Sequence, residues 1–511
     1  MTTEQICIMI SIIAYLGIVI AVGLRFSKKN KSADDFYLGG RKLGPLVTAM
    51  SAEASDMSSW LLMGLPGVAY FFGIAEAAWT AIGLAIGTWV NWLIVAKKIR
   101  RYTQKVDAIT LPDFFANRYR DKSKLLLLIS AVIIVIFFIP YTASGFVACG
   151  KLFSTIFGVD YVPAMIISSL VIVAYTALGG FLAASTTDFI QSIVMSVALV
   201  VVLCFGVSVA GGFNAVMENA KELTGYLSFT ATHNVATGEV GSYDALTIAS
   251  TLAWGLGYFG MPHILLRFMA VNDEKKLTLS RRVATVWVVI SLGVAVLIGI
   301  IGYSMSLADA IPMFESKSAA ESIIVAISDS LSKYGIIFAF IAGIILAGIL
   351  ASTMSTADSQ LLAASSSVSH NIVTGVFGVK TTPKTSVIIA RVTLLVISVV
   401  GIFLALDPNS SVFDIVSFAW AGFGATFGPV VLFALFWKSS NRYGALAGMI
   451  SGGVMVFVWK YVIAKLGGIF AIYELLPAFI IACIAIVVVS LLTPAPEQEI
   501  QDEFDEVTAM K

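Results

Sequence analysis

Two carboxylates and four serines stand inside an otherwise apolar stretch, in the segment SAEASDMSSW, residues 51–60. An ionised carboxylate at the centre of a bilayer costs about 2.5–3.5 kcal/mol, so a membrane chain retains one there only where something compensates it. Asp56 is therefore expected to have a function that compensates this cost. Glu53 is either paired, protonated or turned towards an internal cavity.

A second group of oxygen ligands occurs in LASTMSTADSQLL, residues 350–362. Ser352, Ser355 and Thr356 follow i, i+3, i+4 spacing, so a helix places their three hydroxyls on one face. A small hard cation such as sodium takes several oxygen ligands, and hydroxyls together with carbonyls freed by an unwound helix supply them. The alternative is that each hydroxyl bonds back to the carbonyl four residues earlier, which is common in membrane helices.

Two further acids accompany these groups. Asp188, in STTDFIQ, either draws cations towards the site or caps a helix that opens at Thr186, Thr187 and Asp188 itself. Asp358 follows the hydroxyls on the same span, and it either lines an inner water path or pairs with a neighbouring group.

A second interrupted span contains WGLGYFGMP, residues 254–262. Glycine costs about 1 kcal/mol relative to alanine in a helix interior, and Pro262 removes a backbone donor altogether. Two interrupted spans at corresponding places in two halves of a chain indicate a transporter site near the bilayer midplane.

Aromatic residues supply the other half of the predicted site. Trp254 and Tyr258 flank the second interruption at i, i+4, and Trp60 and Tyr141 complete a set of ring faces. Such rings, together with helix ends and hydroxyls, suit a small zwitterion whose carboxylate is bound by free amides. The residue chemistry leaves a sugar, pantothenate or a neutral solute open.

The elements that position these residues are predicted to be membrane helices. Of the 511 residues, 58% are hydrophobic and 12% are charged, against roughly 25% charged in soluble proteins. The first apolar run has no basic segment before it and no cleavage site after it, so we expect a retained span rather than a signal peptide. Thirteen runs are long enough to cross about 30 Å: 5–25, 45–72, 75–96, 125–150, 161–180, 187–211, 244–266, 283–305, 334–364, 386–406, 411–437, 443–463 and 470–492.

The lysines and arginines predict the orientation. Placing the N-terminus outside puts 25 of the 32 basic residues in or beside alternate loops, as expected for cytoplasmic loops. Nucleic-acid binding is not needed to explain these loops. We therefore expect a multi-pass plasma-membrane protein with its N-terminus outside and its C-terminus in the cytoplasm.

The predicted fold class is an all-α polytopic membrane protein. Omitting the first span and the last two leaves ten, and the interruptions fall in the first and sixth of these, as in a five-plus-five inverted repeat. One transporter domain, 1–492, is predicted to contain an extra helix at 5–25, the repeat core at about 45–437 and two final helices within 443–492. Residues 493–511 are predicted to be a short, acidic, disordered cytoplasmic tail.

Other classes of function are less consistent with the sequence. A sensor that reports a solute without moving it is expected to carry a signalling domain, and the segment after residue 492 is too short for one. An intramembrane enzyme is disfavoured because HExxH and GxGD motifs are missing and the three histidines, His233, His263 and His370, lie far apart in the sequence. A proton in place of sodium remains open on chemistry alone.

Six segments together resemble the sodium/solute symporter family: YLGGRKLGP, ASDMSSWLLMGLPG, ITLPDFF, WGLGYFGMPHI, MSTADSQLL and WAGFGATFGPVVLF. The likeness runs from about residue 35 to residue 460 and is closest to the proline-transporting members. It implies a leucine-transporter-type fold of thirteen helices and uptake of L-proline, or a similar small zwitterion, coupled to Na⁺. It implies no organic cofactor, no nucleic acid and no obligatory protein partner.

The resemblance also implies roles for individual residues. It assigns sodium to the carbonyls of Ala54 and Met57 and the hydroxyls of Ser352, Ser355 and Thr356, with Asp56 and Asp188 in support. It assigns proline to Ser58, Ser59, Trp60, Tyr141, Trp254, Tyr258 and Pro262. Three positions depart from the proline-transporting pattern: Glu53 and Ser59 replace the usual glycine, and Met261 replaces the usual glutamine.

Overall fold

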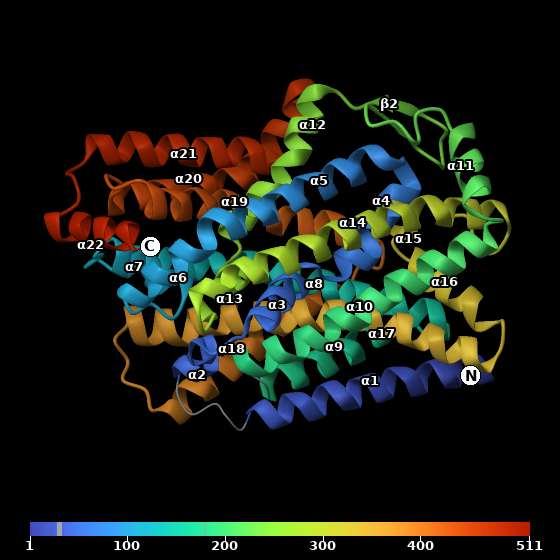
Figure 1. Ribbon diagram of the computed structural model, residues 1–511, viewed down its shortest axis with the longest axis horizontal. Coiled ribbons are helices and arrows are strands. Elements are labelled where there is room, and N and C mark those ends of the chain that lie inside the picture. Colours follow the sequence, from blue (N-terminus) through green and yellow to red (C-terminus); the bar gives the residue numbers. More distant parts are fainter. Residues whose placement is uncertain (28–32, 179, 511) are drawn as a thin grey trace.

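The computed structural model describes residues 1–27, 33–178 and 180–510. Its long helices run roughly side by side along one direction (Figure 1). Ten stretches of the described residues are long and apolar enough to cross a membrane. They are α1 (Thr3–Ser27), α5 (Ile74–Val90) continued by η3 (Asn91–Val95) and α6 (Ala96–Lys105), α8 (Leu125–Phe157), α10 (Phe181–Val209), α14 (Leu277–Leu307) preceded by η5 (Glu274–Lys276), α17 (Ile336–Ser366) continued by η6 (Ser367–Val376), α18 (Pro383–Leu404), α19 (Val412–Phe436), α20 (Arg442–Val458) continued by η7 (Trp459–Ile463) and η8 (Ala464–Leu466), and α21 (Leu475–Leu492).

The other three predicted spans are shorter or broken, and the exact count of thirteen stays a prediction. The span predicted at 161–180 is the single helix α9 (Tyr161–Leu178). The two interrupted spans are discontinuous, as predicted. Their parts are α3 (Pro45–Asp56), η2 (Trp60–Gly64) and α4 (Leu65–Phe72) in the first, and α12 (Ala245–Leu252), η4 (Ala253–Gly260) and α13 (Pro262–Ala270) in the second.

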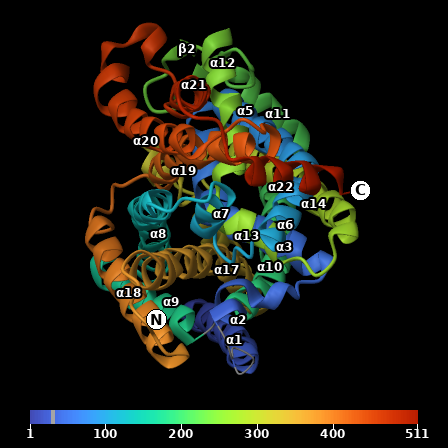
Figure 2. The same ribbon diagram turned by 90° about the vertical axis from the view of Figure 1, so that its left-hand side faces the viewer.

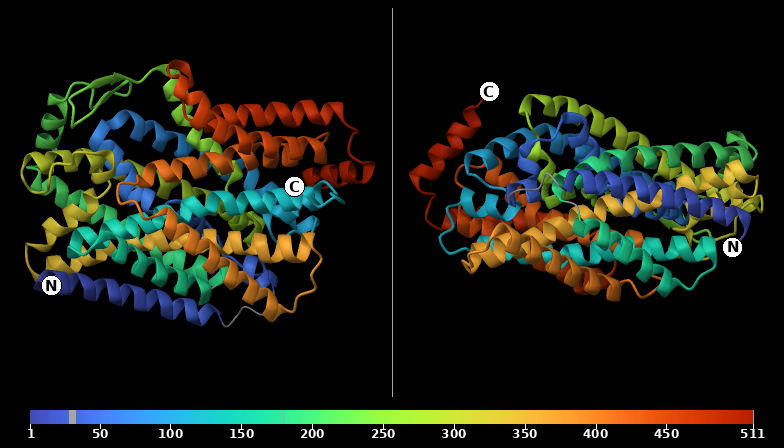
Figure 3. Two further views of the ribbon diagram at one scale, coloured as in Figure 1. Left: turned by 180° about the vertical axis from the view of Figure 1, so that it is seen from behind. Right: turned by 90° about the horizontal axis from the view of Figure 1, so that it is seen from below.

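Short elements cover the two ends of the bundle. A two-stranded antiparallel hairpin, with Thr232 opposite Gly241, lies with α11 and α15 at one end, while α6, α7 and α22 lie at the other (Figure 1). The N- and C-termini also lie at opposite ends, as two further views show (Figure 3). The short helices and strands that have not been placed in a predicted membrane span, or that extend one, have these bounds: α2 (Ala33–Leu38), η1 (Gly39–Arg41), α7 (Leu111–Arg118), α11 (Phe213–Glu222), β1 (Ala231–His233), β2 (Val240–Ser242), η5 (Glu274–Lys276), α15 (Lys317–Ala320), α16 (Ile323–Ser332), η7 (Trp459–Ile463), η8 (Ala464–Leu466), η9 (Gly468–Phe470) and α22 (Gln498–Ala509).

Burial separates the inner helices from the outer ones. In the apolar membrane-spanning stretch of α19, 83% of the residues are buried, and in that of α17 and its continuation the share is 67%. In the corresponding stretch of α18 only 28% of the residues are buried. The view along the bundle shows α3, α13 and α17 inside, with α1, α18 and α20 at the rim (Figure 2). Large apolar side chains on the rim, such as Phe403 at 67% exposed, suit contact with lipid. The breaks at residues 57–59 and 253–261 are themselves almost wholly buried within the protein, where an irregular backbone is tolerated within a membrane.

The prediction of a disordered tail is wrong, because residues 498–509 form the helix α22. Its acidic side chains pair with the basic loops: Glu503 with Arg120 at 2.9 Å and Glu506 with Lys105 at 2.7 Å. One face is apolar, with Ile500, Phe504 and Val507 buried at i, i+4, i+7 spacing. Contacts with the rest of the chain therefore fold a segment whose composition alone is typical of disorder.

Two glycines of α5 allow the end of α12 and the start of η4 to approach very closely. A Cβ built on Gly87 would lie 2.4 Å from the Gly255 Cα, and one on Gly83 would lie 2.6 Å from the Leu252 carbonyl oxygen. Backbone atoms cannot yield as the end of a flexible side chain can. Glycines at i, i+4 spacing commonly mediate such close packing in membranes.

We expect Gly87→Ala to destabilise the protein by about 1–3 kcal/mol, because overpacking forces the backbones of α5 and η4 apart. Thermal unfolding of the detergent-purified protein measures the effect. Gly293→Ala in α14 is the control, since a Cβ there meets no heavy atom within 4 Å. Equal melting temperatures for the two variants would contradict the close packing.

Candidate functional site

The first break follows from hydrogen bonds that leave the helical pattern at residue 57. The Met57 N–H still donates to the Glu53 carbonyl at 2.8 Å, but the Ser58 N–H turns to the Asp56 carbonyl at 2.8 Å. The Ser58 Oγ then accepts from the Trp60 N–H at 3.2 Å. Serine side chains offer the backbone such alternatives, which is why this polar segment does not continue as a helix.

The second break is enforced by close packing against α19. A Cβ on Gly257 would lie 2.0 Å from the Trp420 Nε1, and one on Gly260 would lie 2.3 Å from the Phe423 carbonyl oxygen. The chain becomes extended at Met261, and Pro262 begins α13 as its first residue. Proline suits this position because its missing N–H has no helical partner there.

The two breaks meet at Asp56. The Tyr258 hydroxyl, from η4, donates to the Asp56 Oδ2 at 2.7 Å. The Tyr141 hydroxyl, from α8, donates to the Asp56 carbonyl at 3.2 Å. Asp56 itself is 5% exposed, so its carboxylate lies in the protein interior between three helices.

The hydroxyls of α17 reach the same break from the other side. The Ser355 Oγ donates to the Ala54 carbonyl at 2.7 Å. Bonding back within the helix accounts for Ser352, whose Oγ donates to the Ile349 carbonyl three residues earlier at 2.8 Å. It does not account for Thr356, whose Oγ1 is buried with no hydrogen-bond partner in the described part of the chain. A hydroxyl of this kind is available to a bound cation.

Aromatic rings enclose the region beside Asp56. The Trp60 and Trp254 ring centroids lie 5.5 Å apart. The Ser59 Oγ and the Trp60 Nε1 are buried without a hydrogen-bond partner among the described residues. Buried polar atoms are rarely left unpaired, so these two are available to a polar guest.

Sequence reasoning missed three aromatic neighbours of this group. Phe413 and Tyr473 have ring centroids 5.5 Å and 5.2 Å from that of Trp254, and the Trp420 Nε1 donates to the Trp254 carbonyl at 2.7 Å. Trp420 lies within the glycine-rich segment WAGFGATFGPVVLF, which is the one local signal that marks it as a close-packing partner. Phe413 and Tyr473 carry no such signal.

Asp188 is not a helix cap, so that alternative is wrong. Its helix, α10, begins seven residues earlier at Phe181. The Asp188 Oδ2 instead accepts from the Ser51 Oγ at 2.6 Å and from the Arg267 Nη2 at 3.1 Å. Asp188 is 0% exposed and Arg267 is 1% exposed. This buried ion pair joins α10 to α13, and the Ser51 hydroxyl connects it to α3 at a residue that precedes the first break.

The two remaining acids have single neutral partners. The Glu53 Oε1 accepts from the Trp92 Nε1 at 2.8 Å, while its Oε2 is buried and unpartnered within the described residues. The Asp358 Oδ1 accepts from the adjacent Ser359 Oγ at 3.2 Å. Neither acid makes an ion pair in the described part of the chain. Glu53 lies three residues before Asp56, so the first break carries two buried carboxylates.

This arrangement can bind a small cation beside an organic solute. Carbonyl and hydroxyl oxygens from α3 and α17 converge next to a carboxylate, which is the ligand chemistry that hard cations prefer. The aromatic rings and unpaired donors lie on the neighbouring side of the break. Of the residues predicted to bind sodium or the organic solute, only Asp188 forms an ion pair within the described residues, and its partner is Arg267.

Comparisons with known proteins agree with this chemistry. The profile of the sodium:solute symporter family matches residues 36–452. The sodium/proline symporter of Haemophilus influenzae is 42% identical over 501 residues, with 97% of both chains covered. The sodium/proline symporter of Escherichia coli is 40% identical, with 98% of this chain and 96% of that protein covered. The high-affinity proline transporter of Bacillus subtilis is 40% identical, with 96% of this chain and 98% of that protein covered.

Solved structures show the same fold. A substrate-bound, outward-open Na⁺-coupled sialic acid symporter aligns with a TM-score of 0.79 at 19% identity, covering 96% of this chain and 99% of its own. The transporter MhsT in complex with L-phenylalanine aligns with a TM-score of 0.54 at 16% identity, covering 88% and 98%. The predicted fold class, a leucine-transporter-type helical membrane protein, is thereby confirmed.

Proposed function

Because this chain belongs to the sodium:solute symporter family, we propose that it carries L-proline into the cell together with Na⁺ by alternating access. The observation that carries the proposal is the meeting of two broken helices at the buried carboxylate of Asp56. The proline-transporting relatives support the choice of substrate, since they match this chain over nearly its whole length at about 40% identity. The protein is a transporter and not an enzyme.

Sodium is bound between α3 and α17 in this proposal. The ligands are the carbonyls of Ala54 and Met57 with the hydroxyls of Ser352, Ser355 and Thr356. Asp56 supplies the negative charge nearby, and Asp188 supports the site through its hydrogen bond with the Ser51 hydroxyl of α3. Two observations favour this set: the Ser355 Oγ lies 2.7 Å from the Ala54 oxygen, and the Thr356 hydroxyl has no hydrogen-bond partner among the residues that the structure describes.

Proline binds on the aromatic side of the same break. In this proposal Trp60 and Trp254, whose ring centroids lie 5.5 Å apart, cover the apolar ring of proline. The Ser59 Oγ and Trp60 Nε1, which have no hydrogen-bond partner in the described part of the chain, bind its polar groups. The complete proposed set is Ser58, Ser59, Trp60, Tyr141, Trp254, Tyr258 and Pro262. The hydroxyls of Tyr141 and Tyr258 both donate to Asp56, so residues proposed to bind proline contact a residue proposed to support sodium binding. In this proposal sodium binds first and fixes the positions of these side chains before proline binds.

The proposed orientation has the N-terminus outside and the C-terminus in the cytoplasm, in keeping with the basic loops and with termini at opposite ends of the bundle (Figure 3). One transporter domain spans 1–492 in this view, followed by the segment 493–511, which contains the docked helix α22 (Gln498–Ala509). A single charge that moves down 100 mV supplies about 2.3 kcal/mol, or roughly fiftyfold accumulation. One coupled sodium ion is therefore sufficient for useful uptake.

A competition panel tests the substrate. Purified protein is reconstituted in proteoliposomes with an inward sodium gradient, and labelled L-proline uptake is measured against unlabelled L-proline, L-alanine, pantothenate, glucose and sialic acid. We expect only L-proline and its close ring analogues to compete. Equal competition by pantothenate or a sugar would assign the site to another small solute, in which case Glu53, Ser59 and Met261 are the positions to examine first.

Thr356→Val tests the proposed sodium ligands. The variant keeps the shape of the side chain and removes its oxygen, so we expect the sodium concentration for half-maximal uptake to rise about tenfold. Thr353→Val is the matched control, since the Thr353 Oγ1 bonds to the Ile349 carbonyl of its own helix at 2.9 Å. Sodium titration of uptake gives both values, and an unchanged half-saturation in Thr356→Val would remove this residue from the site.

A further inference from the structure

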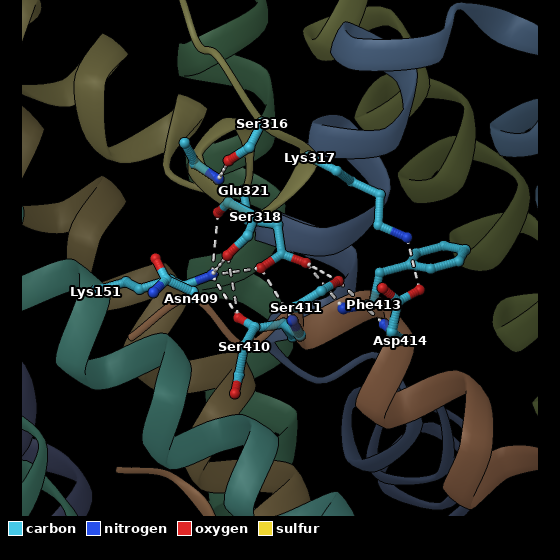
Figure 4. A network of polar contacts seen from close by, with 12 residues as sticks. Lys151, Ser316, Lys317, Ser318, Glu321, Asn409, Ser410, Ser411, Phe413 and Asp414 are labelled. Carbon is cyan, nitrogen blue, oxygen red and sulfur yellow. Dashed lines mark hydrogen bonds and ion pairs between the residues drawn. The ribbon is translucent and has the colours of Figure 1, made fainter. Parts of the chain in front are cut away.

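Buried acids in this structure differ in how well their charge is compensated. Glu321, which follows α15, accepts from the Lys151 ammonium at 2.8 Å, from one hydroxyl and from two backbone N–H groups at the start of α19 (Figure 4). Asp188 accepts from the Arg267 guanidinium at 3.1 Å and from one hydroxyl. Buried charges in proteins are normally paired in this way or coordinate metal ions. Glu53 departs from this pattern.

Glu53 has a single, neutral partner. The residue is 1% exposed, and its Oε1 accepts from the Trp92 Nε1 at 2.8 Å. Its Oε2 has no hydrogen-bond or ion-pair partner among the residues that the structure describes. Asp56 follows three residues later on the same face of α3 and adds a second negative charge. Two carboxylates that lie so close together repel each other, so the first break favours more than one cation.

The helix that binds Glu53 presents three side chains on one face. Thr88, Asn91 and Trp92 follow i, i+3, i+4 spacing across the junction of α5 and η3, and the bond from Trp92 turns this face towards α3. Thr88 is 0% exposed and Asn91 is 1% exposed. The Thr88 Oγ1 and the Asn91 Oδ1 have no hydrogen-bond partner in the described part of the chain. Buried oxygens are rarely left unpaired, and oxygen ligands are those that hard cations prefer.

The second break closes this group of side chains. The Tyr258 hydroxyl donates to the Asp56 Oδ2 at 2.7 Å, and the Tyr258 carbonyl accepts from the Asn91 Nδ2 at 3.1 Å. The Thr88 side chain lies near the same Tyr258 hydroxyl. The segment η3 is π-helical, and π-helical turns occur frequently at functional sites. The unpaired oxygens of α3, α5 and η3 therefore belong to one group of contacting side chains.

We propose that Glu53, Thr88 and Asn91 bind a second sodium ion, so that two sodium ions accompany each substrate molecule. The ligands are the Glu53 Oε2, the Thr88 Oγ1 and the Asn91 Oδ1, and Glu53 supplies the compensating charge. This inference rests on the proposed function, in which the first ion is bound between α3 and α17. Glu53 stands where the proline-transporting pattern has glycine, so the second site is a property of this chain rather than of that pattern.

The ratio of sodium to proline tests the site. Initial fluxes of radioactive sodium and labelled L-proline are measured in the same proteoliposomes. We expect two sodium ions per proline in the unaltered protein and one in Glu53→Gln, since glutamine keeps an oxygen for Trp92 but removes the charge. At 100 mV each coupled charge contributes about fiftyfold accumulation, so the limit should fall from about 2,500-fold to about fiftyfold.

Asp414→Asn is the control for the loss of an acid. Its side chain is 57% exposed and pairs with Lys317 at 2.6 Å, at the start of α19 (Figure 4). The ratio should stay at two in this variant. A ratio of one in the unaltered protein, or a ratio of two in Glu53→Gln, would overturn the inference.

Thr88→Val tests a neutral ligand without changing the charge. We expect the sodium concentration for half-maximal uptake to rise about tenfold, because the variant keeps the shape of the side chain and removes its oxygen. Thr80→Val is the matched control: Thr80 also lies in α5, is 0% exposed and has a hydroxyl without a partner among the described residues. At 1.5 Å per residue it lies about 12 Å away along the helix. Equal changes in the two variants would contradict the site.

Equilibrium binding separates this inference from the proposed function. Radioactive sodium is titrated into the detergent-purified protein without proline, and we expect two bound ions in the unaltered protein and one in Glu53→Gln. Two bound ions without any proline accumulation would contradict the proposed function and support the site. Proline accumulation with one bound ion would support the function and overturn the site. One bound sodium with two charges moved per proline would assign a proton to Glu53, which would also overturn the sodium site.

Discussion

Asp56→Asn is expected to raise the sodium concentration for half-maximal uptake more than a hundredfold, which would abolish uptake at ordinary sodium concentrations. The carboxylate is 5% exposed and lies at the end of α3, beside the carbonyl and hydroxyl oxygens proposed to bind sodium. Two unit charges about 5 Å apart interact by about 3 kcal/mol at an effective dielectric constant of 20, which corresponds to more than two orders of magnitude in affinity. Sodium titration of proline uptake in proteoliposomes measures the change.

The asparagine variant retains an oxygen for the Tyr258 hydroxyl, so the break itself should persist. Asp329→Asn in α16 is the control, because the Asp329 side chain is 45% exposed and pairs with Lys333, the residue that follows α16. Exposed pairs of this kind contribute about 0–1 kcal/mol, and uptake should be unaffected. Sodium stimulation in Asp56→Asn equal to that of the control would exclude Asp56 from the mechanism.

Asp188→Asn should have a different consequence, a loss of stability of about 3–5 kcal/mol, because it leaves the buried Arg267 guanidinium without its counter-charge. Arg267 also donates to the Ser51 Oγ at 3.0 Å and to the His263 carbonyl at 2.9 Å, so it connects α13 to α3. We expect a lower melting temperature and slower uptake at every sodium concentration. Thermal unfolding in detergent and uptake measured with sodium in excess give the two quantities.

The double variant Asp188→Asn with Arg267→Met distinguishes an unpaired charge from a lost contact. Replacing both members of a buried pair by groups of similar volume is often neutral, so at least half of the lost stability should return. Uptake should stay low, since the link between α13 and α3 is absent. A double variant that is less stable than Asp188→Asn alone would contradict this account of the pair.

The two breaks could be predicted because their causes are local. Serine and aspartate at 55–58, and three glycines before Pro262, weaken helices wherever they occur. Their meeting at Asp56 could not be read from spacing, since Tyr258 lies 202 residues away along the chain. The resemblance to a known family supplied that juxtaposition, and the hydrogen bonds of Asp56 give its physical basis.

The two predictions that were wrong, the helix cap at Asp188 and the disordered tail, depend on contacts between segments that are distant in the sequence. Asp188 was open to interpretation as a cap because Arg267, 79 residues away, has no signal in the sequence that marks it as a partner. The tail was predicted to be disordered from its acidic composition, although Ile500, Phe504 and Val507 already formed an apolar stripe. Basic residues at the same end of the bundle supply the counter-charges that help to fold α22.

The central claim is that sodium and proline bind together at the break beside Asp56, and coupled uptake tests it most directly. Labelled L-proline uptake into proteoliposomes is compared with an inward sodium gradient, and with sodium replaced by choline at the same membrane potential. We predict accumulation above equilibrium only with the sodium gradient, and its collapse when the gradient is dissipated. Equal uptake in the two conditions would contradict the account.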